Sequence, residues 1–454
     1  MPLSNVIHTP TIQLTLALFS GALLYYTIDR LRNQYSLDGY SFHPLSFSNS
    51  LDLSSLTSIT PPAGLPLASV GISGSIGNTP LIKLPGLSAA TGCSIYLKAE
   101  ALNPGGSPKD RVALSILTDL EATHNLVSGS GDTIYEATVG STGISLATLC
   151  RSRGYGCHIV MPSDQSVEKS DMLRKLGAVV ERVEPAPITD QAHFVNVARQ
   201  RAREHFERGA RGKEGGQDSI GKGRGFFADQ FETGANWKAH YAGTGPEIWA
   251  QMNTGEPGSG DSGIDAFVAG AGTGGTVTGV GLYLKEKVRE EQNHNNTKAT
   301  RKVKVVVADP QGSGLYNKVK HGVMFGQFER EGTRRRDQVD SVIEGIGLTR
   351  STKNFDKGYD EGVFDDAVRV NDQQARNMAR WLVEREGVFA GGSTAVNCVA
   401  ALRTALELGP GHRIVTIWCD SGMRHLSKFW KQIGEIGGEA KVTIEDVLGG
   451  RDDF

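Results

Sequence analysis

The chain has 454 residues, enough for two or three domains at about 150 residues per domain. Hydrophobic residues make up 39% and charged residues 22%, and a net charge of -2 gives no reason to expect nucleic acid or another polyanion as partner. The five cysteines are scattered, without a spacing typical of a metal site or a disulfide framework, so a reducing compartment is favoured.

The first residues differ from the rest of the chain. Residues 11–28 contain no charged side chain, and Asp29, Arg30 and Arg32 follow them. About 18 apolar residues is the lower limit for a membrane-spanning helix, and positive charge after a span favours a cytosolic C-terminal side. We therefore predict a membrane anchor over residues 1–32 and a linker over residues 33–70. A cleaved presequence and a buried helix are the alternatives.

From Ile76 onward, short apolar strands alternate with helices, which predicts parallel sheets flanked by helices. The predicted strands are 133–136, 158–161, 178–183, 264–269, 303–308 and 413–418, and the predicted helices are 112–120, 144–153, 167–176 and 277–287. Three Gly-rich or charged stretches are predicted loop insertions, at 208–225, 253–263 and 290–301.

A lysine in a glycine-rich turn is the first candidate for chemistry. The turn NPGGSPKDR begins at Asn103, and a predicted helix follows it. The positive end of the helix dipole disfavours an ammonium group, so the pKa of Lys109 is expected to fall. A neutral amine at this position is nucleophilic towards an aldehyde.

Three further loops follow predicted strands. The run GAGTGGT from Gly270 lies between strand and helix, where converging backbone N–H groups form a phosphate site, and it lacks the lysine of a nucleotide P-loop. The run EATVGSTG from Glu136 offers hydroxyl groups and amides suited to a carboxylate. The run WCDSG from Trp418 lies at the carboxyl end of the last strand, the edge where open α/β sheets bind ligands.

Together these loops resemble the cysteine synthase and cystathionine β-synthase family of fold-type II pyridoxal phosphate (PLP) enzymes. The resemblance covers about residues 75–437 in the family's order. The matching stretches are GNTPL from Gly77, NPGGSPKDR from Asn103, QFE from Gln230, TGPEIW from Thr244, GTGGT from Gly272 and EGIG from Glu344. The N-terminus is similar to a fungal branch associated with the mitochondrial outer membrane.

The resemblance implies that Lys109 forms an internal aldimine with PLP and later removes the substrate α-proton. The implied cofactor-binding residues are Lys109, Ser141, Gly272, Thr273, Gly274, Gly275, Thr276 and Ser421, and the implied substrate-binding residues are Thr138, Gly140, Thr142 and Gln230. Ser421 matches the serine that faces the pyridine nitrogen, where a hydroxyl leaves the ring a weaker electron sink and favours loss of a β-leaving group. If the adjacent Asp420 faced the nitrogen, this argument would reverse.

The sequence departs from the family in three places. Val139 and Ser141 stand where the family has Ser and Asn, Pro108 replaces an apolar residue, and AGGSTA from Ala390 replaces a GISSGA pattern. These changes indicate an altered choice of donor or acceptor.

The resemblance implies β-replacement, in which O-acetyl-L-serine and sulfide give L-cysteine and acetate through an aminoacrylate. The alternatives are cystathionine formation, cysteine desulfhydration, serine dehydration, and a non-catalytic PLP-binding scaffold tethered to a membrane. No metal ion is expected to take part.

The implied α/β fold has two three-layer domains with the cofactor in the cleft between them. The larger domain combines residues 71–106 with 235–445, the smaller mobile domain covers 107–234, and residues 446–454 form a tail. A homodimer is expected. The catalytic body is expected to face the cytosol from the mitochondrial outer membrane, with the mitochondrial matrix or the cytosol as alternatives.

Overall fold

The computed structural model describes residues 69–214, 223–254, 263–295, 302–325, 341–436 and 441–449. The chain divides into two units, Met1–Leu67 and Ala68–Phe454, and every described residue lies in the second. The predicted anchor, nearly all of the predicted linker and the interiors of the three predicted insertions lie outside the described residues. Within the described ranges no helix is long and apolar enough to cross a membrane.

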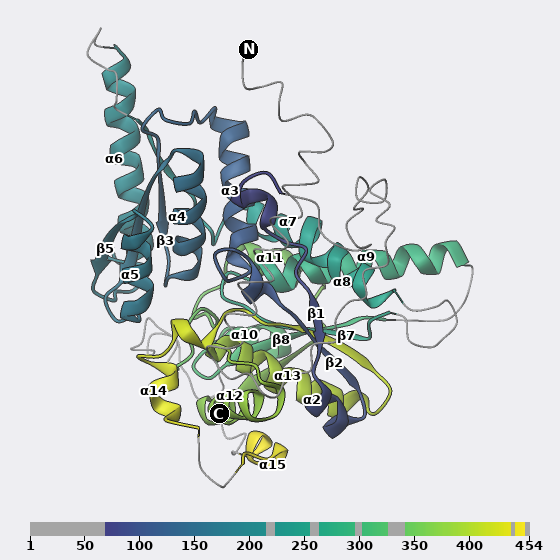
Figure 1. Cartoon of the computed structure of the whole chain (residues 1–454). Coiled ribbons are helices and arrows are strands. Elements are labelled where there is room, and N and C mark those ends of the chain that lie inside the picture. Colours follow the sequence, from purple (N-terminus) through teal and green to yellow (C-terminus); the bar gives the residue numbers. More distant parts are fainter. Residues whose placement is uncertain are drawn as a thin grey trace, which may run out of the picture. The chain divides into compact units, whose positions relative to one another are not determined.

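The larger of two sheets has six strands in the order β1-β2-β10-β7-β8-β9. Figure 1 labels four of them, β1, β2, β7 and β8. Only β1 runs antiparallel to its neighbour, and the other four pairings are parallel. The strands are β1 (Leu81–Lys83), β2 (Ser94–Lys98), β7 (Ala266–Gly270), β8 (Lys304–Pro310), β9 (Asp366–Val370) and β10 (Arg413–Ile417).

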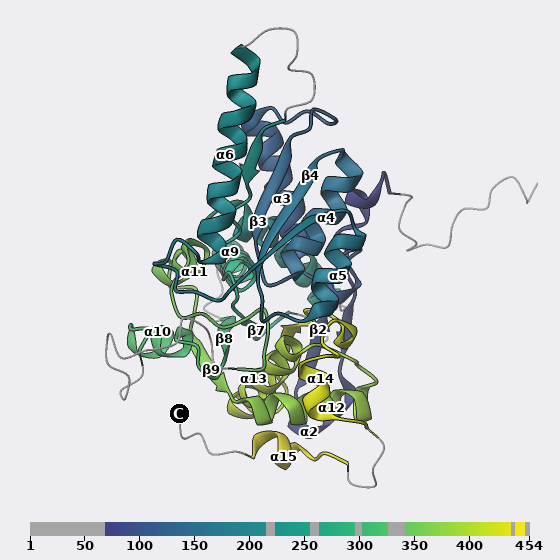
Figure 2. The same ribbon diagram turned by 90° about the vertical axis from the view of Figure 1, so that its left-hand side faces the viewer.

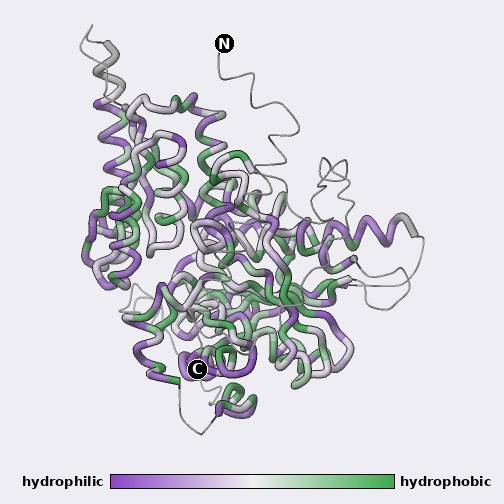
Figure 3. Tube along the Cα trace, viewed as in Figure 1, coloured by the Kyte–Doolittle hydropathy of each residue, from purple (hydrophilic) through white to green (hydrophobic). Residues whose placement is uncertain are grey.

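Helices cover both faces of this sheet, because both faces of its central strands are apolar. Successive residues of a strand point to opposite faces. Val268 of β7 packs with α2 (Pro85–Thr91), α12 (Asp372–Glu386) and α13 (Gly392–Leu408), whereas its neighbour Phe267 packs with α8 (Gly245–Met252) and α9 (Gly275–Asn295). Shorter helices complete the cover: α10 (Leu315–His321), α11 (Lys353–Asp360), α14 (Phe429–Ile433) and α15 (Ile444–Leu448). Figure 3 shows the hydrophobic colour concentrated along these central strands.

The smaller sheet has four parallel strands in the order β5-β4-β3-β6. Figure 2 shows its central strands, β3 and β4. They are β3 (Thr133–Ala137), β4 (Gly156–Pro162), β5 (Val179–Val183) and β6 (Gly225–Phe227). Ile159 of β4 packs with α3 (Lys109–His124), α4 (Ser141–Arg153) and α5 (Val167–Lys175), and its neighbour Val160 packs with α6 (Phe194–Glu214). Each sheet is therefore the middle of three layers, which confirms the predicted α/β class.

All ten predicted elements of regular structure are confirmed, with most ends shifted by no more than four residues. The prediction of a loop from Arg208 is wrong over its first residues, because α6 continues to Glu214. Likewise α9 continues to Asn295, into the stretch predicted as an insertion from Glu290. The boundary predicted for the tail, residue 446, falls within α15, whose Thr443 and Asp446 form a capping box.

Candidate active site

A cavity of about 630 Å³ lies where the carboxyl ends of strands from both sheets meet. Loops that follow β3, β4, β7 and β10 all contribute to its wall, as does the turn that carries Lys109. Ligands of open α/β sheets bind at this edge, because the strands end there and the loops are free to carry polar groups. The cavity therefore unites the four loops singled out in the sequence.

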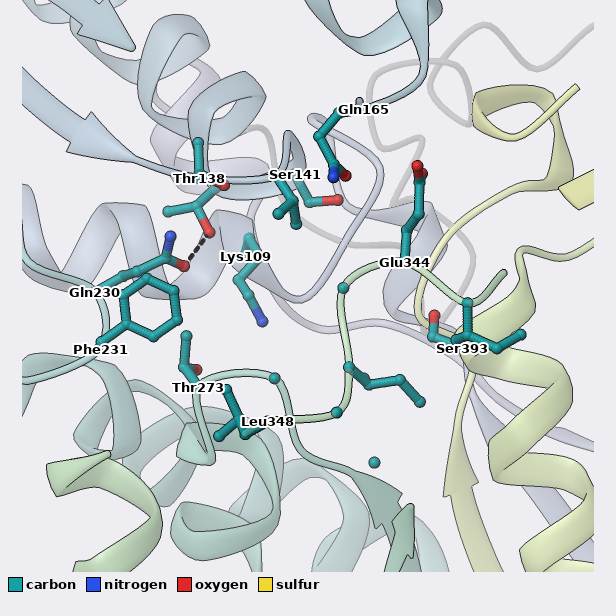
Figure 4. A pocket seen from close by; sticks show the side chains of 18 of the residues that line it. Lys109, Thr138, Ser141, Gln165, Gln230, Phe231, Thr273, Glu344, Leu348 and Ser393 are labelled. Atoms are coloured by element: carbon teal, nitrogen blue, oxygen red, sulfur yellow. Dashed lines mark hydrogen bonds between the residues drawn. The ribbon is translucent and has the colours of Figure 1, made fainter. Parts of the chain in front are cut away.

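Lys109 points into this cavity from the first position of α3 (Figure 4). Among the described residues no hydrogen-bond partner lies within reach of its amine. Burial is the largest influence and lowers the pKa of Lys109, while Cys419 and Asp420 act in the opposite direction without cancelling it. The sequence predicted the direction of this shift but attributed it to the helix dipole. A neutral amine at this position is a competent nucleophile and base.

The turn before Lys109 is held from two sides. The backbone N–H of Gly105 donates to Asp110 at 2.6 Å, and the side chain of Arg424 donates to the carbonyl of Gly105. Asp110 also accepts a hydrogen bond from Ser145 of α4. Gly106 has a φ of 76° and lies against the Arg424 guanidinium, so a side chain here would be strained and would have to displace that guanidinium. The turn is consequently fixed relative to both α4 and the segment after β10.

Two residues beyond the lysine, Arg111 ties α3 to the larger sheet. Its Nε lies 2.7 Å from Glu100, and its Nη1 lies 2.7 Å from Glu247 of α8. Lys98 adds a third contact, at 2.6 Å from Glu247. Burial raises the pKa of Glu247, but Arg111 and Lys98 outweigh it and bring this pKa to about 2. This buried ion network fixes the position of the helix whose first residue is Lys109.

The glycine loop between β7 and α9 is closely packed against its surroundings. A Cβ on Gly272 would lie 2.1 Å from the carbonyl oxygen of Gly345, and a Cβ on Gly275 would lie 1.9 Å from the side chain of Asn236. Asn236 also donates to the Thr273 hydroxyl at 2.9 Å. The N-terminus of the long helix α9 presents N–H groups without intrahelical partners at this loop. The loop is thus shaped to hold a phosphate group by its backbone.

The hydroxyl-rich loop after β3 faces the same cavity from the smaller sheet. The Thr138 hydroxyl accepts the N–H of Gly140 at 3.1 Å. The Thr142 hydroxyl donates to Gln230 at 2.5 Å, and a dashed line at Gln230 marks this bond in Figure 4. Gln230 in turn donates to the carbonyl of Ala137 at 2.9 Å. Gln230 therefore bridges the two ends of this loop and fixes its hydroxyl and amide groups at the wall, where they could bind a carboxylate.

Most of the predicted site residues are brought together in the wall of the cavity. Those that line it are Lys109, Thr138, Ser141, Thr142, Gln230, Gly272, Thr273, Gly274 and Thr276. Gly140 and Gly275 belong to the same loops but are not among the lining residues. Ser421 also lies outside the wall: its hydroxyl accepts the N–H of Met423 and caps a short 3-10 helix, Gly422–Arg424.

The structure adds wall residues that the sequence did not assign. Glu344 lies beside Lys169 of α5 and 3.2 Å from Lys428, and all three line the wall. His425, which is not among the lining residues, lies 3.5 Å from Glu344 and 2.9 Å from Asp420. Burial raises the pKa of Glu344, but His425 and Lys169 outweigh it and hold the net pKa well below its ordinary value. Glu344 stood within a stretch that resembled the family, which was the one signal for it. The cluster joins elements packed on both sheets.

The residues present fit pyridoxal phosphate: a buried amine with no hydrogen-bond partner in the described part of the chain, a backbone cradle at a helix start and a cavity of suitable size. These features define the chain as a fold-type II PLP enzyme. The family described as pyridoxal-phosphate dependent enzyme matches residues 72–420, and the chain belongs to it.

Named relatives agree with this assignment. The chain is 55% identical over 407 residues to cysteine synthase 2 of Emericella nidulans, which covers 89% of this chain and 90% of the relative. It is 59% identical over 381 residues to cysteine synthase 2 of Neurospora crassa, and the match covers 83% of this chain and 77% of the relative. It is 48% identical over 384 residues to the putative mitochondrial cysteine synthase of Saccharomyces cerevisiae, and the match covers 85% of this chain and 89% of the relative. Among solved structures, O-ureido-L-serine synthase is similar, with a TM-score of 0.63 and 29% sequence identity. The match covers 82% of this chain and 98% of that structure's chain.

The glycine loop gives a prediction for cofactor affinity. Gly274 has a φ of 85°, and a Cβ there would lie 2.7 Å from backbone atoms of Phe355. Because the loop must move to admit a methyl group, we expect Gly274→Ala to raise the Kd for pyridoxal phosphate by at least about tenfold. Titration of the cofactor-free variant and wild-type proteins with pyridoxal phosphate measures this Kd.

Gly387 provides the matched control. It also has a positive φ, 67°, at the end of α12, but no atom lies within 4 Å of its Cβ position. Gly387→Ala is expected to cost about 1 kcal/mol of stability and to leave the cofactor Kd unchanged. Equal affinities in the two variants would show that the loop does not hold the phosphate.

Proposed function

We propose that this enzyme is a cysteine synthase, which converts O-acetyl-L-serine and sulfide to L-cysteine and acetate. The observation that carries the proposal is the buried Lys109 amine, which faces the cavity between the glycine loop and the Thr138–Thr142 loop. The relatives named cysteine synthase, 48% to 59% identical over most of the chain, support it.

Residues 272–276 would hold the cofactor phosphate, and Lys109 would bind its aldehyde carbon covalently. When bound, pyridoxal phosphate supplies an electron sink for the negative charge that develops at the substrate Cα. The neutral Nζ of Lys109, once free of the cofactor, would remove the proton from the substrate Cα. Acetate then leaves from Cβ, sulfide adds to Cβ, and Lys109 returns the proton to Cα.

The loop after β3 is proposed to bind the substrate carboxylate. Thr138, Gly140 and Thr142 provide hydroxyl and backbone groups, and Gln230 holds the loop in place through its contacts at 2.5 and 2.9 Å. Binding fixes the substrate with its Cα facing Lys109, which converts binding energy into orientation. Closure of the loop on the substrate keeps water from reacting at Cβ. Ser141 is proposed to contact the 3′-oxygen of the cofactor.

The proposal extends to the organisation of the whole chain. The smaller domain, residues 107–234, contains the four-stranded sheet, and the larger domain combines 71–106 with 235–445. A domain that moves as a unit would open and close the cavity around the substrate. The enzyme is proposed to act as a homodimer.

The N-terminal residues 1–32 are proposed to anchor the enzyme in the mitochondrial outer membrane with its catalytic body in the cytosol. The uncharged run 11–28 supports the anchor, and the Saccharomyces relative named as putatively mitochondrial supports the organelle. We expect removal of residues 1–32 to release the protein from membranes while kcat/KM stays within about twofold. Membrane fractionation of the full-length and truncated proteins measures the release, and turnover assays of the two proteins measure kcat/KM. Loss of activity in a folded truncated protein would contradict a simple anchor.

A product assay tests the proposed reaction. The purified enzyme is given O-acetyl-L-serine with sulfide, and separately L-serine with homocysteine, L-cysteine alone and L-serine alone. The proposal predicts that the first pair gives the highest kcat/KM, with cysteine and acetate formed in equal amounts. Faster formation of cystathionine, sulfide or pyruvate from the other substrates would assign a different β-elimination or replacement. No product from any of them would indicate a scaffold.

A further inference from the structure

A fully buried carboxyl group, that of Glu136, lies on β3 just before the Thr138–Thr142 loop. Its Oε1 accepts the backbone N–H of Ala137 at 2.7 Å, and its Oε2 accepts the backbone N–H of Gln230 at 3.1 Å. In the described part of the chain no cationic side chain pairs with Glu136. Burying a carboxyl group is costly, so these two hydrogen bonds are its main compensation.

The two bonds reach both segments that hold the loop. Ala137 ends β3 and leads directly into the loop, whereas Gln230 follows β6 and bridges the two ends of the loop with its side chain. The carbonyl of Gln230 accepts hydrogen bonds from the side chains of Asn236 at 2.7 Å and Asn354 at 3.1 Å. With its N–H on Glu136 and its carbonyl on these amides, the backbone of Gln230 is fixed from two sides.

A second buried carboxyl group joins the same two strands at their opposite ends. Asp132 lies just before β3, and its Oδ1 accepts the backbone N–H of Arg224, just before β6, at 2.8 Å. The guanidinium of Arg224 also lies 2.8 Å from Asp132. Neither residue lines the cavity. Asp132 thus joins β3 to β6 through a cation and away from the cavity, whereas Glu136 joins them through amide groups and next to the loop.

We infer that Glu136 is a positioning residue for the substrate carboxylate: it fixes Gln230 and the start of the Thr138–Thr142 loop, and so sets how tightly an amino acid binds. Glu136 does not itself line the cavity, so it acts through Gln230 and the loop. Binding groups that are already in place need not be ordered by the ligand, and loosening them therefore costs affinity. The inference rests on the amino-acid site of the proposed function but not on its β-replacement chemistry.

Charge gives Glu136 a second influence on the same site. Burial raises the pKa of Glu136 to about 8, and the N–H groups of Gln230 and Ala137 act in the opposite direction without cancelling it. Two titratable groups face it: Asp229, which raises this pKa further, and Cys157 of β4, whose thiol stays protonated in this range. Glu136 is therefore mostly uncharged at neutral pH and gains a negative charge as the pH passes about 8. That charge would repel a carboxylate bound on the loop.

Selective loss of carboxylate binding tests the inference. The visible band of the full chain with its cofactor reports the binding of L-alanine, which has no leaving group, and of ethylamine, which is L-alanine without its carboxylate. Glu136→Gln keeps the size of the side chain but replaces one accepting oxygen by an NH2 group. We expect it to raise the Kd for L-alanine at neutral pH by at least about tenfold and the Kd for ethylamine by less than about twofold.

Asp132→Asn is the matched control, because it alters a buried carboxyl group on the same pair of strands. It is expected to change both values of Kd by less than about twofold. Equal weakening of both ligands in Glu136→Gln would show a merely structural role and overturn the inference. An unchanged Kd for L-alanine, or the same selective loss in Asp132→Asn, would overturn it too.

The wild-type protein provides a test that needs no variant. The ratio of the Kd for L-alanine to the Kd for ethylamine is expected to rise between about pH 7 and pH 9, as Glu136 loses its proton, and to stay constant in Glu136→Gln. A constant ratio in the wild type overturns the inference even if Glu136→Gln fails to fold, and so does an equal rise in the variant. Selective weakening of L-alanine together with no turnover of O-acetyl-L-serine would refute the proposed reaction alone.

Discussion

Replacement of Lys109 by alanine is expected to lower kcat by at least about 10³, within the range that a positioned general base contributes. The side chain projects into a cavity and has no hydrogen-bond partner among the described residues, so its removal leaves no buried group unpaired. The variant is therefore expected to fold. It should also lose the visible absorption band that depends on the covalent bond between the lysine and the cofactor, although it can still bind the cofactor through the glycine loop.

Two measurements decide this prediction, the visible spectrum and the turnover of the same preparation. Lys175→Ala is the control, because Lys175 is an exposed lysine at the end of α5. It should keep both the band and the activity. If Lys109→Ala kept the wild-type band, another lysine would hold the cofactor and the assignment of Lys109 would be wrong.

The second large effect concerns stability. Arg111→Met leaves Glu100, which is fully buried, and Glu247 without their shared guanidinium. Breaking a buried ion pair from one side costs about 3–5 kcal/mol, because a charge stays buried without compensation. We expect a loss of this size in the free energy of unfolding, measured by urea denaturation at saturating cofactor.

Arg153→Met is the matched control for this loss. Arg153 forms a salt bridge of 2.6 Å with Glu121, but both side chains are partly exposed, 22% and 29%. Solvent screens such a pair, so its loss should cost less than about 1 kcal/mol. Similar losses in the two variants would show that the Arg111 network contributes no more than a surface pair.

Most of the fold could be predicted because its signals are local. A strand, a glycine-rich loop and a helix follow one another at Gly270, and the same order recurs at Glu136. Each loop thus reaches the edge of a sheet by its position in the alternation. The extension of α6 to Glu214 was missed because the glycines at 209 and 212 indicated a loop. The Arg, Ala and Glu residues around them are good helix formers and outweigh the glycines.

The part of the site that could not be predicted depends on tertiary packing. Lys169 and Glu344 are 175 residues apart, and nothing in their local sequence indicates that they meet. The position of Ser421 likewise depends on where the chain turns after β10. The turn begins at Ser421, which uses its hydroxyl as a helix cap and leaves Asp420 in the cavity wall.

The most direct test of the account is the visible absorption spectrum of the purified enzyme during a single round of the reaction. O-Acetyl-L-serine is added first and sulfide second, while acetate and cysteine are measured. The account predicts that the resting cofactor band changes as acetate is released, and that sulfide restores it with one cysteine formed per active site. A resting band that never changes on addition of O-acetyl-L-serine, with no cysteine formed, would contradict the proposed cysteine synthase activity.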